Sequence, residues 1–365
     1  MAESKKIAII GAGIFGLAIA EKLQKLNYQI DIFEKNKNIL SGASRNNLNR
    51  IHQGFHYPRS MTTINQSSAN YKIFIKKFKF FVKNKQMSYY LIAKNGSKVS
   101  LDKYLKIIKN IPYFSEEVST EQIPIKTSNI LGGIITHEKI YDWQSMEKYF
   151  KNNLKDNINF LFNEYVHSIN KNNTLTIKKQ KKYIDTPKYQ FIIDCSYSKQ
   201  NNFKRNLGIP LKKKIFQKTL ILELQFKNCP DIGAAVMDGK FVSFLPKGKS
   251  KNVFLLYDVS HSILKRKISF LYPKNFKNKI SNKKIVSAKK KIIKKLNFFF
   301  PEIEIKKILN YRISDRVLDL SRNDQRLTNV KFWKNSVFFV NQGKTDHCIE
   351  VAENIYTKIK KFNVN

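Results

Sequence analysis

A glycine-rich turn lies near the N-terminus, between a short apolar strand and an amphipathic helix. The turn Gly11–Gly16 has the pattern GxGxxG and directly follows the β-branched run Ile7–Ile10, which is typical of a buried parallel strand. Apolar residues recur at helical spacing over Leu17–Leu26, and a second strand is expected over Tyr28–Phe33. This order of strand, turn, helix and strand predicts an α/β domain that binds a dinucleotide.

The residues of the turn differ in the task that each would perform. Gly11 makes the tight turn, Gly13 lets the backbone approach a pyrophosphate, and Gly16 allows close packing of the helix on the strand. The charge of the pyrophosphate would lie at the helix N-terminus, beside Ile14 and Phe15. The alternative is a glycine-rich turn in an ordinary α/β domain that holds no nucleotide.

An acidic residue ends the second expected strand. Glu34 can accept hydrogen bonds from the hydroxyls of an adenosine ribose, and Lys35 follows it in the same candidate site. A carboxylate here disfavours a 2′-phosphate, so NADP is the least expected dinucleotide. The turn and the acid do not by themselves separate FAD from NAD.

The next segment separates the two cofactors. Three Arg, two His and two aromatic residues fall within the fifteen positions from Arg45 to Arg59, and the segment ends in the pattern R-I-H-Q-G-F-H-Y-P-R-S. Residues 41–59 resemble the D-amino-acid-oxidase-like (DAO) superfamily of FAD-dependent oxidoreductases, nearest the branch of L-2-hydroxyglutarate and glycerol-3-phosphate dehydrogenases. The resemblance implies FAD as the cofactor; the alternative is a polar surface loop.

The resemblance also implies individual cofactor contacts. Four residues would contact the phosphates and the ribityl chain: Ser44, Arg45, Asn46 and Asn47. Ile51 and His52 would lie beside the isoalloxazine, where Gly54 permits close approach of the backbone to a flat ring. The residue types agree, because Ser, Arg and Asn are suitable donors for an anionic, hydroxyl-rich ligand.

A strand, a glycine turn and a helix are expected again near the C-terminus. The strand covers Ser336–Val340 and the helix Cys348–Ile359. The resemblance implies that Gly343, Lys344 and Thr345 face the pyrimidine end of the flavin, where a helix N-terminus and a cation stabilise negative charge. An ordinary βα unit is the alternative.

Two further cofactor contacts are implied at the adenosine end. Val166, on a strand expected over Asn163–His167, would contact adenine. A small-residue turn is expected after the strand Tyr189–Cys195, but here the turn Cys195–Ser198 contains no glycine, which departs from the family pattern.

The same resemblance implies a discontinuous domain organisation within an α/β fold that is α+β overall. A Rossmann-like FAD-binding domain would comprise residues 1–85, 136–205 and 311–365. An inserted antiparallel-sheet substrate domain would comprise residues 86–135 and 206–310. Strands are expected over Thr219–Phe226, Ala234–Met237, Phe241–Pro246 and Val253–Val259, with Asp238-Gly239 as a hairpin signal.

The expected chemistry is hydride transfer from a CH–OH or CH–NH group to flavin. His52 and His56 are the candidate bases, because an unperturbed His titrates near neutral pH. His52 has alternative roles as a packing residue, a hydrogen-bond partner of the flavin or a covalent attachment point. Anchors for a carboxylate or phosphate are expected among Tyr57, Arg59, Arg312, Arg316 and Arg326, although Arg312 and Arg316 could instead pair with Asp315 and Asp319.

The formal charge of +41 is large, but it does not by itself identify the class of binding partner. Only nine of the 68 basic residues are Arg, and the Lys excess is spread through the chain together with Asn and Ile. This distribution does not favour nucleic-acid binding. The field attracts a small anionic substrate and leaves contact with an anionic membrane surface open.

No transmembrane run, disulfide framework or metal motif is expected. No stretch of eighteen apolar residues occurs, and the three Cys are widely spaced. The apolar stretch Ile7–Ala20 could pass for a signal peptide, but its glycines and the amphipathic continuation favour a strand, turn and helix in a cytoplasmic protein.

The sequence therefore predicts an FAD-dependent oxidoreductase for a small anionic hydroxy acid, amino acid or sugar derivative, with an unknown electron acceptor. The alternatives are an NAD-linked dehydrogenase, a non-catalytic flavin-binding protein and a basic nucleic-acid-binding protein.

Overall fold

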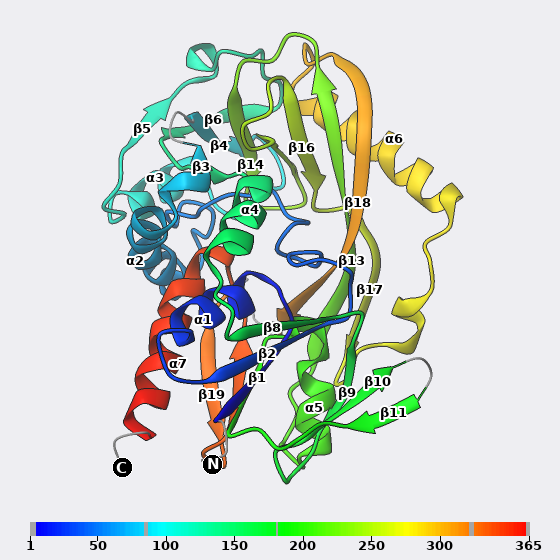
Figure 1. The fold of residues 1–365 in the computed structure, drawn as a ribbon. Helices are drawn as coiled ribbons and strands as arrows, with labels where there is room; N and C mark the ends of the chain where they lie inside the picture. Colours follow the sequence, from blue (N-terminus) through cyan, green and yellow to red (C-terminus); the bar gives the residue numbers. More distant parts are fainter. Residues whose placement is uncertain (1–4, 84–86, 180–181, 321–324, 363–365) are drawn as a thin grey trace.

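The computed structural model describes residues 5–83, 87–179, 182–320 and 325–362. Two large sheets divide the molecule, one in the lower and one in the upper half of Figure 1. The lower sheet has the strand order β19-β20-β12-β1-β2-β8 and is parallel except for the edge strand β19. Its strands are β1 (Lys6–Ile10), β2 (Gln29–Glu34), β8 (Ile158–Phe162), β12 (Phe191–Asp194), β19 (Asn329–Trp333) and β20 (Val337–Asn341).

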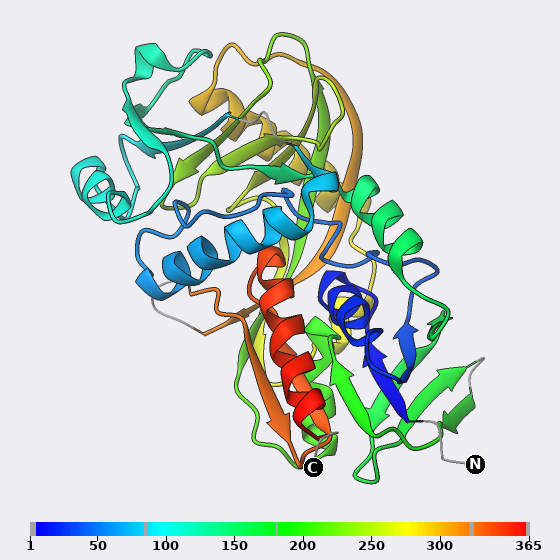
Figure 2. The same ribbon diagram turned by 60° about the vertical axis from the view of Figure 1, so that its left-hand side comes forward.

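Both faces of this parallel sheet are covered, as its apolar sequence requires. Ile7 and Ile9 of β1 pack with α1 (Ile14–Leu23) and α7 (Cys348–Phe362), which lie side by side in Figures 1 and 2. Ala8 and Ile10 face the opposite layer. That layer contains α5 (Gln200–Asn206) and a three-stranded sheet of β9 (Tyr165–Ile169), β10 (Leu175–Lys179) and β11 (Lys182–Asp185).

The upper sheet is larger and mixed. Its order is β17-β13-β16-β15-β14-β4-β6-β5, with β18 paired to β13. The strands are β4 (Met87–Ala93), β5 (Ser115–Val118), β6 (Ile130–Thr136), β13 (Lys214–Phe226), β14 (Ile232–Met237), β15 (Val242–Pro246), β16 (Val253–Asp258), β17 (Ile263–Ser269) and β18 (Ile305–Asp319). All pairs are antiparallel except β14–β4, which is parallel, because these strands come from two separate insertions and no hairpin joins them.

Helices cover the upper sheet and connect it to the lower one. Apolar residues of α6 (Asn282–Phe299) pack against one face, and α3 (Leu101–Ile108) contributes to a separate cluster with β4 and β14. Between the sheets lie α2 (Met61–Lys77), α4 (Trp143–Asn153) and the short pair β3 (Val82–Lys83) and β7 (Ile140–Tyr141). The boundary predicted between residues 310 and 311 falls inside β18.

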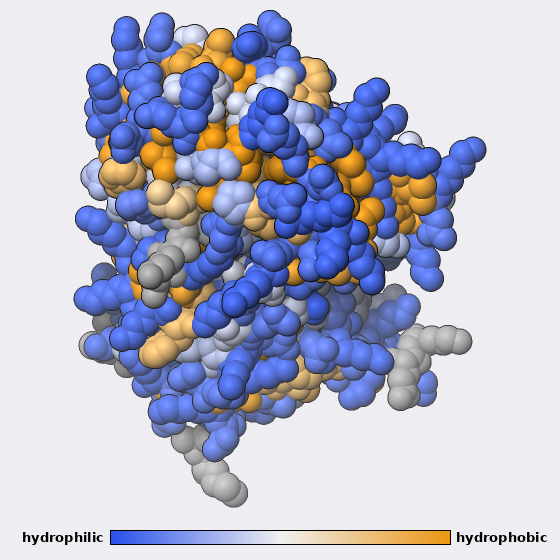
Figure 3. All heavy atoms as spheres, turned by 90° about the horizontal axis from the view of Figure 1, so that it is seen from above, coloured by the Kyte–Doolittle hydropathy of each residue, from blue (hydrophilic) through white to orange (hydrophobic). Residues whose placement is uncertain are grey.

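The distribution of side chains on the surface agrees with a positive charge that is spread over the molecule. Seen from above the upper sheet, hydrophilic side chains cover most of the face and hydrophobic patches lie between them (Figure 3). Among the described helices, none is both long enough and apolar enough to cross a bilayer.

Candidate functional site

The turn between β1 and α1 has the geometry that its glycines predict. Gly11 has φ +106°, and a Cβ on it would lie 2.9 Å from the carbonyl oxygen of Cys195. A Cβ on Gly16 would lie 2.1 Å from the carbonyl oxygen of Gly11, so only glycine lets the helix approach the turn this closely. Gly13 begins α1 without a side-chain cap of its own.

Ser44 reaches the N-terminus of α1 from the adjacent loop. The Ile14 backbone N–H donates to Ser44 Oγ at 3.0 Å, and the Cβ position of Gly13 lies 3.2 Å from the same oxygen. The helix start, the glycine turn and the polar loop therefore converge at one point. This is where backbone N–H groups and the helix dipole favour a phosphate.

Glu34 closes the adenosine end. One carboxylate oxygen accepts from the Ala12 backbone N–H at 3.0 Å, and the other accepts from the Asn36 backbone N–H at 2.9 Å. Glu34, Lys35 and Val166 line one cavity of about 250 Å³ together with Gly11 and Gly13. Oε1 also accepts from the Asn36 side-chain amide at 2.6 Å, so the second lone pair of Oε2 is the one suitable for a ribose hydroxyl.

The turn after β12, which lacks glycine, is made by a tyrosine. Tyr197 takes φ +57°, a left-handed conformation that a bulky residue seldom adopts. Its hydroxyl accepts from the Val317 backbone N–H at 2.9 Å and donates to the Val317 carbonyl at 3.2 Å. These bonds to β18 hold the turn and offset its strain.

A second cavity, of about 390 Å³, continues from the first. The two share the wall residues Ala43, Ser44, Asn46, Tyr197, Ser314, Asp315 and Gln342. The larger one is lined by the predicted residues Ile14, Phe15, Ser44, Asn46, Asn47, His52, His56, Tyr57, Gly343, Lys344 and Thr345. The structure thus brings the N-terminal turn and the Gly343 turn to one continuous space.

Four predicted site residues line neither cavity: Gly16, Arg45, Ile51 and Arg312. The guanidinium of Arg45 stacks on the Trp143 ring at 3.7 Å, and Ile51 is fully buried in the core of the lower sheet. Arg312 donates to Glu223 at 3.0 Å and to the Arg45 carbonyl at 3.2 Å, so it supports the loop from behind.

His52 is held from several directions. Its backbone N–H donates to Asp346 at 3.0 Å, and its Nε2 lies 3.0 Å from Lys344 Nζ. When Lys344 is protonated it donates to Nε2, and Nδ1 then carries the proton of the neutral ring. Burial, followed by the charge of Lys344, lowers the pKa of His52 well below its ordinary value, and His56 is shifted in the same direction by burial and Arg50. Both rings are therefore neutral.

Lys344 and Asp346 form a buried unit beside His52. Burial lowers the pKa of Lys344 and raises that of Asp346, while the attraction between them opposes both shifts. Lys344 Nζ also lies 4.1 Å from the centre of the Tyr57 ring, a favourable site for a cation. Lys344 lines the cavity, whereas Asp346 is about 1% exposed and lies behind it.

A second pair of buried charged residues, Arg50 and Glu138, was not predicted from the sequence. Arg50 Nη1 donates to Glu138 at 3.3 Å, and the guanidinium stacks 4.6 Å from the Tyr90 ring centre. Its Nη2 is buried without a hydrogen-bond partner among the described residues, although Arg50 lines the cavity. Arg50 could have been chosen from the sequence, because it stands in the pattern R-I-H-Q-G-F-H-Y-P-R-S. Glu138 could not, because its partners are remote in sequence.

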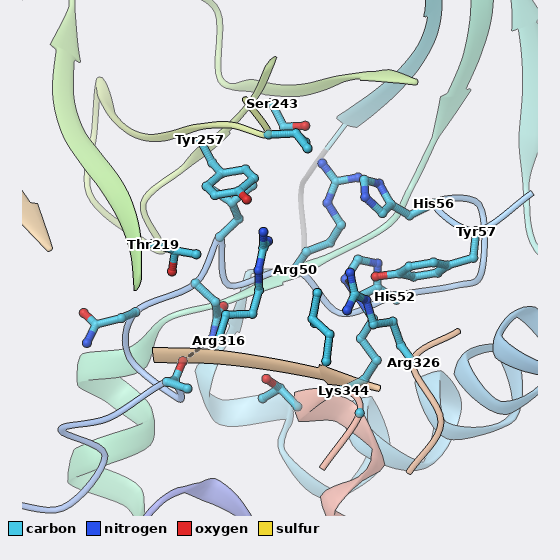
Figure 4. A pocket seen from close by; sticks show the side chains of 18 of the residues that line it. Arg50, His52, His56, Tyr57, Thr219, Ser243, Tyr257, Arg316, Arg326 and Lys344 are labelled. Atoms are coloured by element: carbon cyan, nitrogen blue, oxygen red, sulfur yellow. Dashed lines mark hydrogen bonds between the residues drawn. The ribbon is translucent and has the colours of Figure 1, made fainter. Parts of the chain in front are cut away.

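The side chains of the larger cavity divide into two groups. Figure 4 shows His52, His56 and Tyr57 together on one side, Thr219, Tyr257 and Arg316 on the other, and Arg50 between them. Arg50 and Lys344 line the cavity, whereas Glu138, which forms an ion pair with Arg50, and Asp346, which attracts Lys344, do not. The wall therefore presents positive charge without a net buried charge, an arrangement that suits an anion.

The residues fit an elongated dinucleotide with a flat ring at one end. Gly11 and Gly16 form the cradle, because a side chain at either position would clash with neighbouring backbone atoms. Hydroxyl and amide donors follow at Ser44, Asn46 and Asn47. Opposite them lies the Gly343–Thr345 turn. A 3-10 turn, Thr345–His347, leads directly into α7 and points the start of that helix toward the same space.

Known proteins are similar to this chain in sequence. The family described as FAD dependent oxidoreductase (DAO) matches residues 6–233. An FAD-dependent monooxygenase of Fusarium mangiferae (FPY4) is 25% identical over 261 residues, 71% of this chain and 65% of that protein. The FAD-dependent monooxygenase kojA of Aspergillus flavus is 36% identical over 63 residues, 17% of this chain and 15% of that protein. The matches thus span less than two thirds of these relatives.

Solved structures show the same fold at low identity. Glycine oxidase from Geobacillus kaustophilus superposes with a TM-score of 0.73 at 10% identity, covering 98% of this chain and 95% of the other. L-α-glycerophosphate oxidase from Mycoplasma pneumoniae with FAD bound gives a TM-score of 0.73 at 15% identity, with the same coverage.

Proposed function

Because the chain belongs to the FAD dependent oxidoreductase (DAO) family, we propose that it oxidises a CH–OH or CH–NH group of a small anionic substrate, a hydroxy acid, an amino acid or a sugar derivative. The family makes FAD, rather than NAD, the cofactor. The fold neighbours named for glycine and glycerophosphate support this range of substrates and do not choose within it.

The unpartnered Nη2 of Arg50 is the observation that carries the proposal. A buried guanidinium nitrogen without a partner costs free energy, and an anionic ligand would remove that cost. Arg50 is one of the residues that line the larger cavity, and Lys344 adds a second cation to the same wall. A carboxylate or phosphate placed against Arg50 would accept a charge-assisted hydrogen bond.

The neutral imidazole of His52 is the group proposed to accept the substrate proton. Bound FAD supplies the acceptor of the hydride. Nε2 of His52 takes the proton from the substrate hydroxyl or amine in place of its hydrogen bond from Lys344. Asp346 accepts the backbone N–H of His52, and burial together with Lys344 keeps the ring unprotonated beforehand.

The direct test combines cofactor release with a substrate screen. Denatured protein should release FAD, or retain it in the precipitate if the link is covalent. The native protein should then reduce an artificial electron acceptor with at least one member of a panel of 2-hydroxy acids, amino acids, sugar acids and glycerol 3-phosphate. Turnover only with uncharged substrates would contradict the proposal.

A monooxygenase activity is the second candidate, because the two curated relatives are named FAD-dependent monooxygenases. The screen should therefore be repeated under ¹⁸O₂. Product that contains ¹⁸O from dioxygen would favour this activity, and product without it would favour simple dehydrogenation.

We predict that the acid limb of the kcat/KM pH profile lies below the ordinary His pKa of 6.5. The reason is that a lowered pKa keeps His52 unprotonated, and so able to accept a proton, at more acidic pH. Replacing Lys344 by methionine removes a cation 3.0 Å from Nε2, so the limb should move to higher pH. A wild-type limb at or above pH 6.5 would contradict His52 as the base.

A further inference from the structure

Glu138 lies where two segments that run side by side begin to separate. The Tyr141 N–H donates to the Asn49 carbonyl at 2.8 Å, and the Ile51 N–H donates to the Lys139 carbonyl at 2.9 Å. The next N–H along, that of Gln53, donates instead to the Glu138 side chain at 2.6 Å. The carboxylate thus replaces a backbone acceptor at the end of this ladder.

The same carboxylate binds residues on both sides of His52. Oε1 accepts from the backbone of Gln53, and Oε2 accepts from the Arg50 guanidinium at 3.3 Å. The hydroxyl of Tyr90, on β4 of the upper sheet, also donates to Oε2. Glu138 itself has no exposed surface and does not line the cavity.

We infer that Glu138 is a positioning residue, which aims the Nη2 of Arg50 into the cavity and fixes the loop that carries His52. The inference rests on the proposed function, because it assigns Arg50 to the substrate anion. Glu138 would act only through these neighbours and would not touch the substrate.

Arg50, Tyr90 and Gln53 each donate a hydrogen bond to the Glu138 carboxylate. Burial raises the pKa of Glu138, but Arg50, the Tyr90 hydroxyl and the Gln53 N–H each oppose that shift. Three donors converging on one carboxylate fix its orientation, and the carboxylate in turn fixes one edge of the planar guanidinium. The stacking of Arg50 on Tyr90 fixes the plane. With one edge and the plane of the Arg50 guanidinium fixed, Nη2 can point in only one direction.

Anion binding by the FAD-loaded protein tests this role without knowledge of the substrate. Acetate, oxalate and inorganic phosphate are titrated, and the visible absorption of the bound flavin is followed. The variants are Glu138→Asp, which keeps the charge but shortens the reach, and Glu138→Gln, which turns an amide N–H₂ toward donors. Each is prepared with native Arg50 and with Arg50→Lys, which keeps a cation opposite Glu138 but has no second guanidinium nitrogen.

We expect each Glu138 variant to raise the Kd of the best-bound anion about tenfold with native Arg50, as for loss of an oriented charged hydrogen bond. With Arg50→Lys the same changes should have almost no further effect, because the group that Glu138 orients is already gone. A merely structural role would give equal, additive losses in both backgrounds.

The outcomes separate the inference from the function that it rests on. If Glu138→Asp, which keeps the buried charge balance, binds anions as the wild-type protein does, the positioning role is wrong and the anion site stands. Additive losses in the two backgrounds would overturn it as well. If the wild-type protein binds none of the three anions, the anionic-substrate proposal fails, and the inference fails with it.

Discussion

Replacing Gly16 by alanine is expected to abolish FAD binding and to lower the free energy of unfolding by about 1–3 kcal/mol, the usual cost of overpacking. Helix propensity by itself would favour alanine by about 1 kcal/mol. The added Cβ, however, would lie 2.1 Å from the Gly11 carbonyl oxygen, which is backbone and cannot move aside as a flexible side chain does. The turn between β1 and α1 must therefore shift, and the pyrophosphate cradle shifts with it.

Gly42→Ala is the matched control for this change. It lies in the adjacent loop, and a Cβ there would meet nothing within 4 Å. Because Gly42 also lines the smaller cavity, this variant is the control for stability, and we expect it to unfold as the wild-type protein does. Both variants are compared by the flavin-to-protein absorbance ratio after gel filtration and by thermal unfolding. Normal FAD content in Gly16→Ala would show that the cradle is not at this turn.

Replacing Arg50 by lysine is expected to lower kcat/KM for the anionic substrate about 10- to 100-fold. This range corresponds to the loss of one charged hydrogen bond, about 1.5–3 kcal/mol. Lysine retains a positive charge that can pair with Glu138, so the buried carboxylate is not left uncompensated. What is lost is Nη2, the nitrogen that has no partner among the described side chains.

Arg312→Lys is the control for this change. The sequence predicts Arg312 as an anchor for the substrate anion, whereas the structure favours Arg50. Arg312 pairs with Glu223 and lies outside the residues that line either cavity. We expect its kcat/KM to change less than about threefold, because lysine keeps the charge that pairs with the buried Glu223 and the side chain does not line either cavity. The proposal would be wrong if Arg312→Lys were the more damaging of the two, and steady-state kinetics at fixed pH and ionic strength measures both.

Much of the nucleotide site could be predicted because its determinants are local. Gly11, Gly13 and Gly16 act within one strand–turn–helix unit, and Glu34 ends the strand beside it. The helix begins at Ile14, three residues before the predicted Leu17, because the apolar periodicity does not show that Gly13 starts it. The strand and helix around Gly343 were predicted for the same local reason.

The errors concern side chains whose direction depends on remote partners. Arg45 was expected at the phosphates, but its guanidinium finds the Trp143 ring, almost a hundred residues away in the chain. Tyr197 lies in the turn that departs from the family pattern by containing no glycine, and bonds to the distant strand β18 make its left-handed backbone tolerable. Neither partner can be chosen from the spacing of residues along the chain.

From the sequence it follows that this chain builds a dinucleotide cradle, because steric limits on glycine and the period of apolar residues act over a few neighbouring positions. Only the tertiary structure decides which cations face the substrate. Arg50 and Lys344 reach the cavity because Glu138 and Asp346 are packed behind them, and the cost of burying a charge without a partner requires each carboxylate to lie beside its cation. The contact of Lys344 with His52 joins segments from opposite ends of the chain.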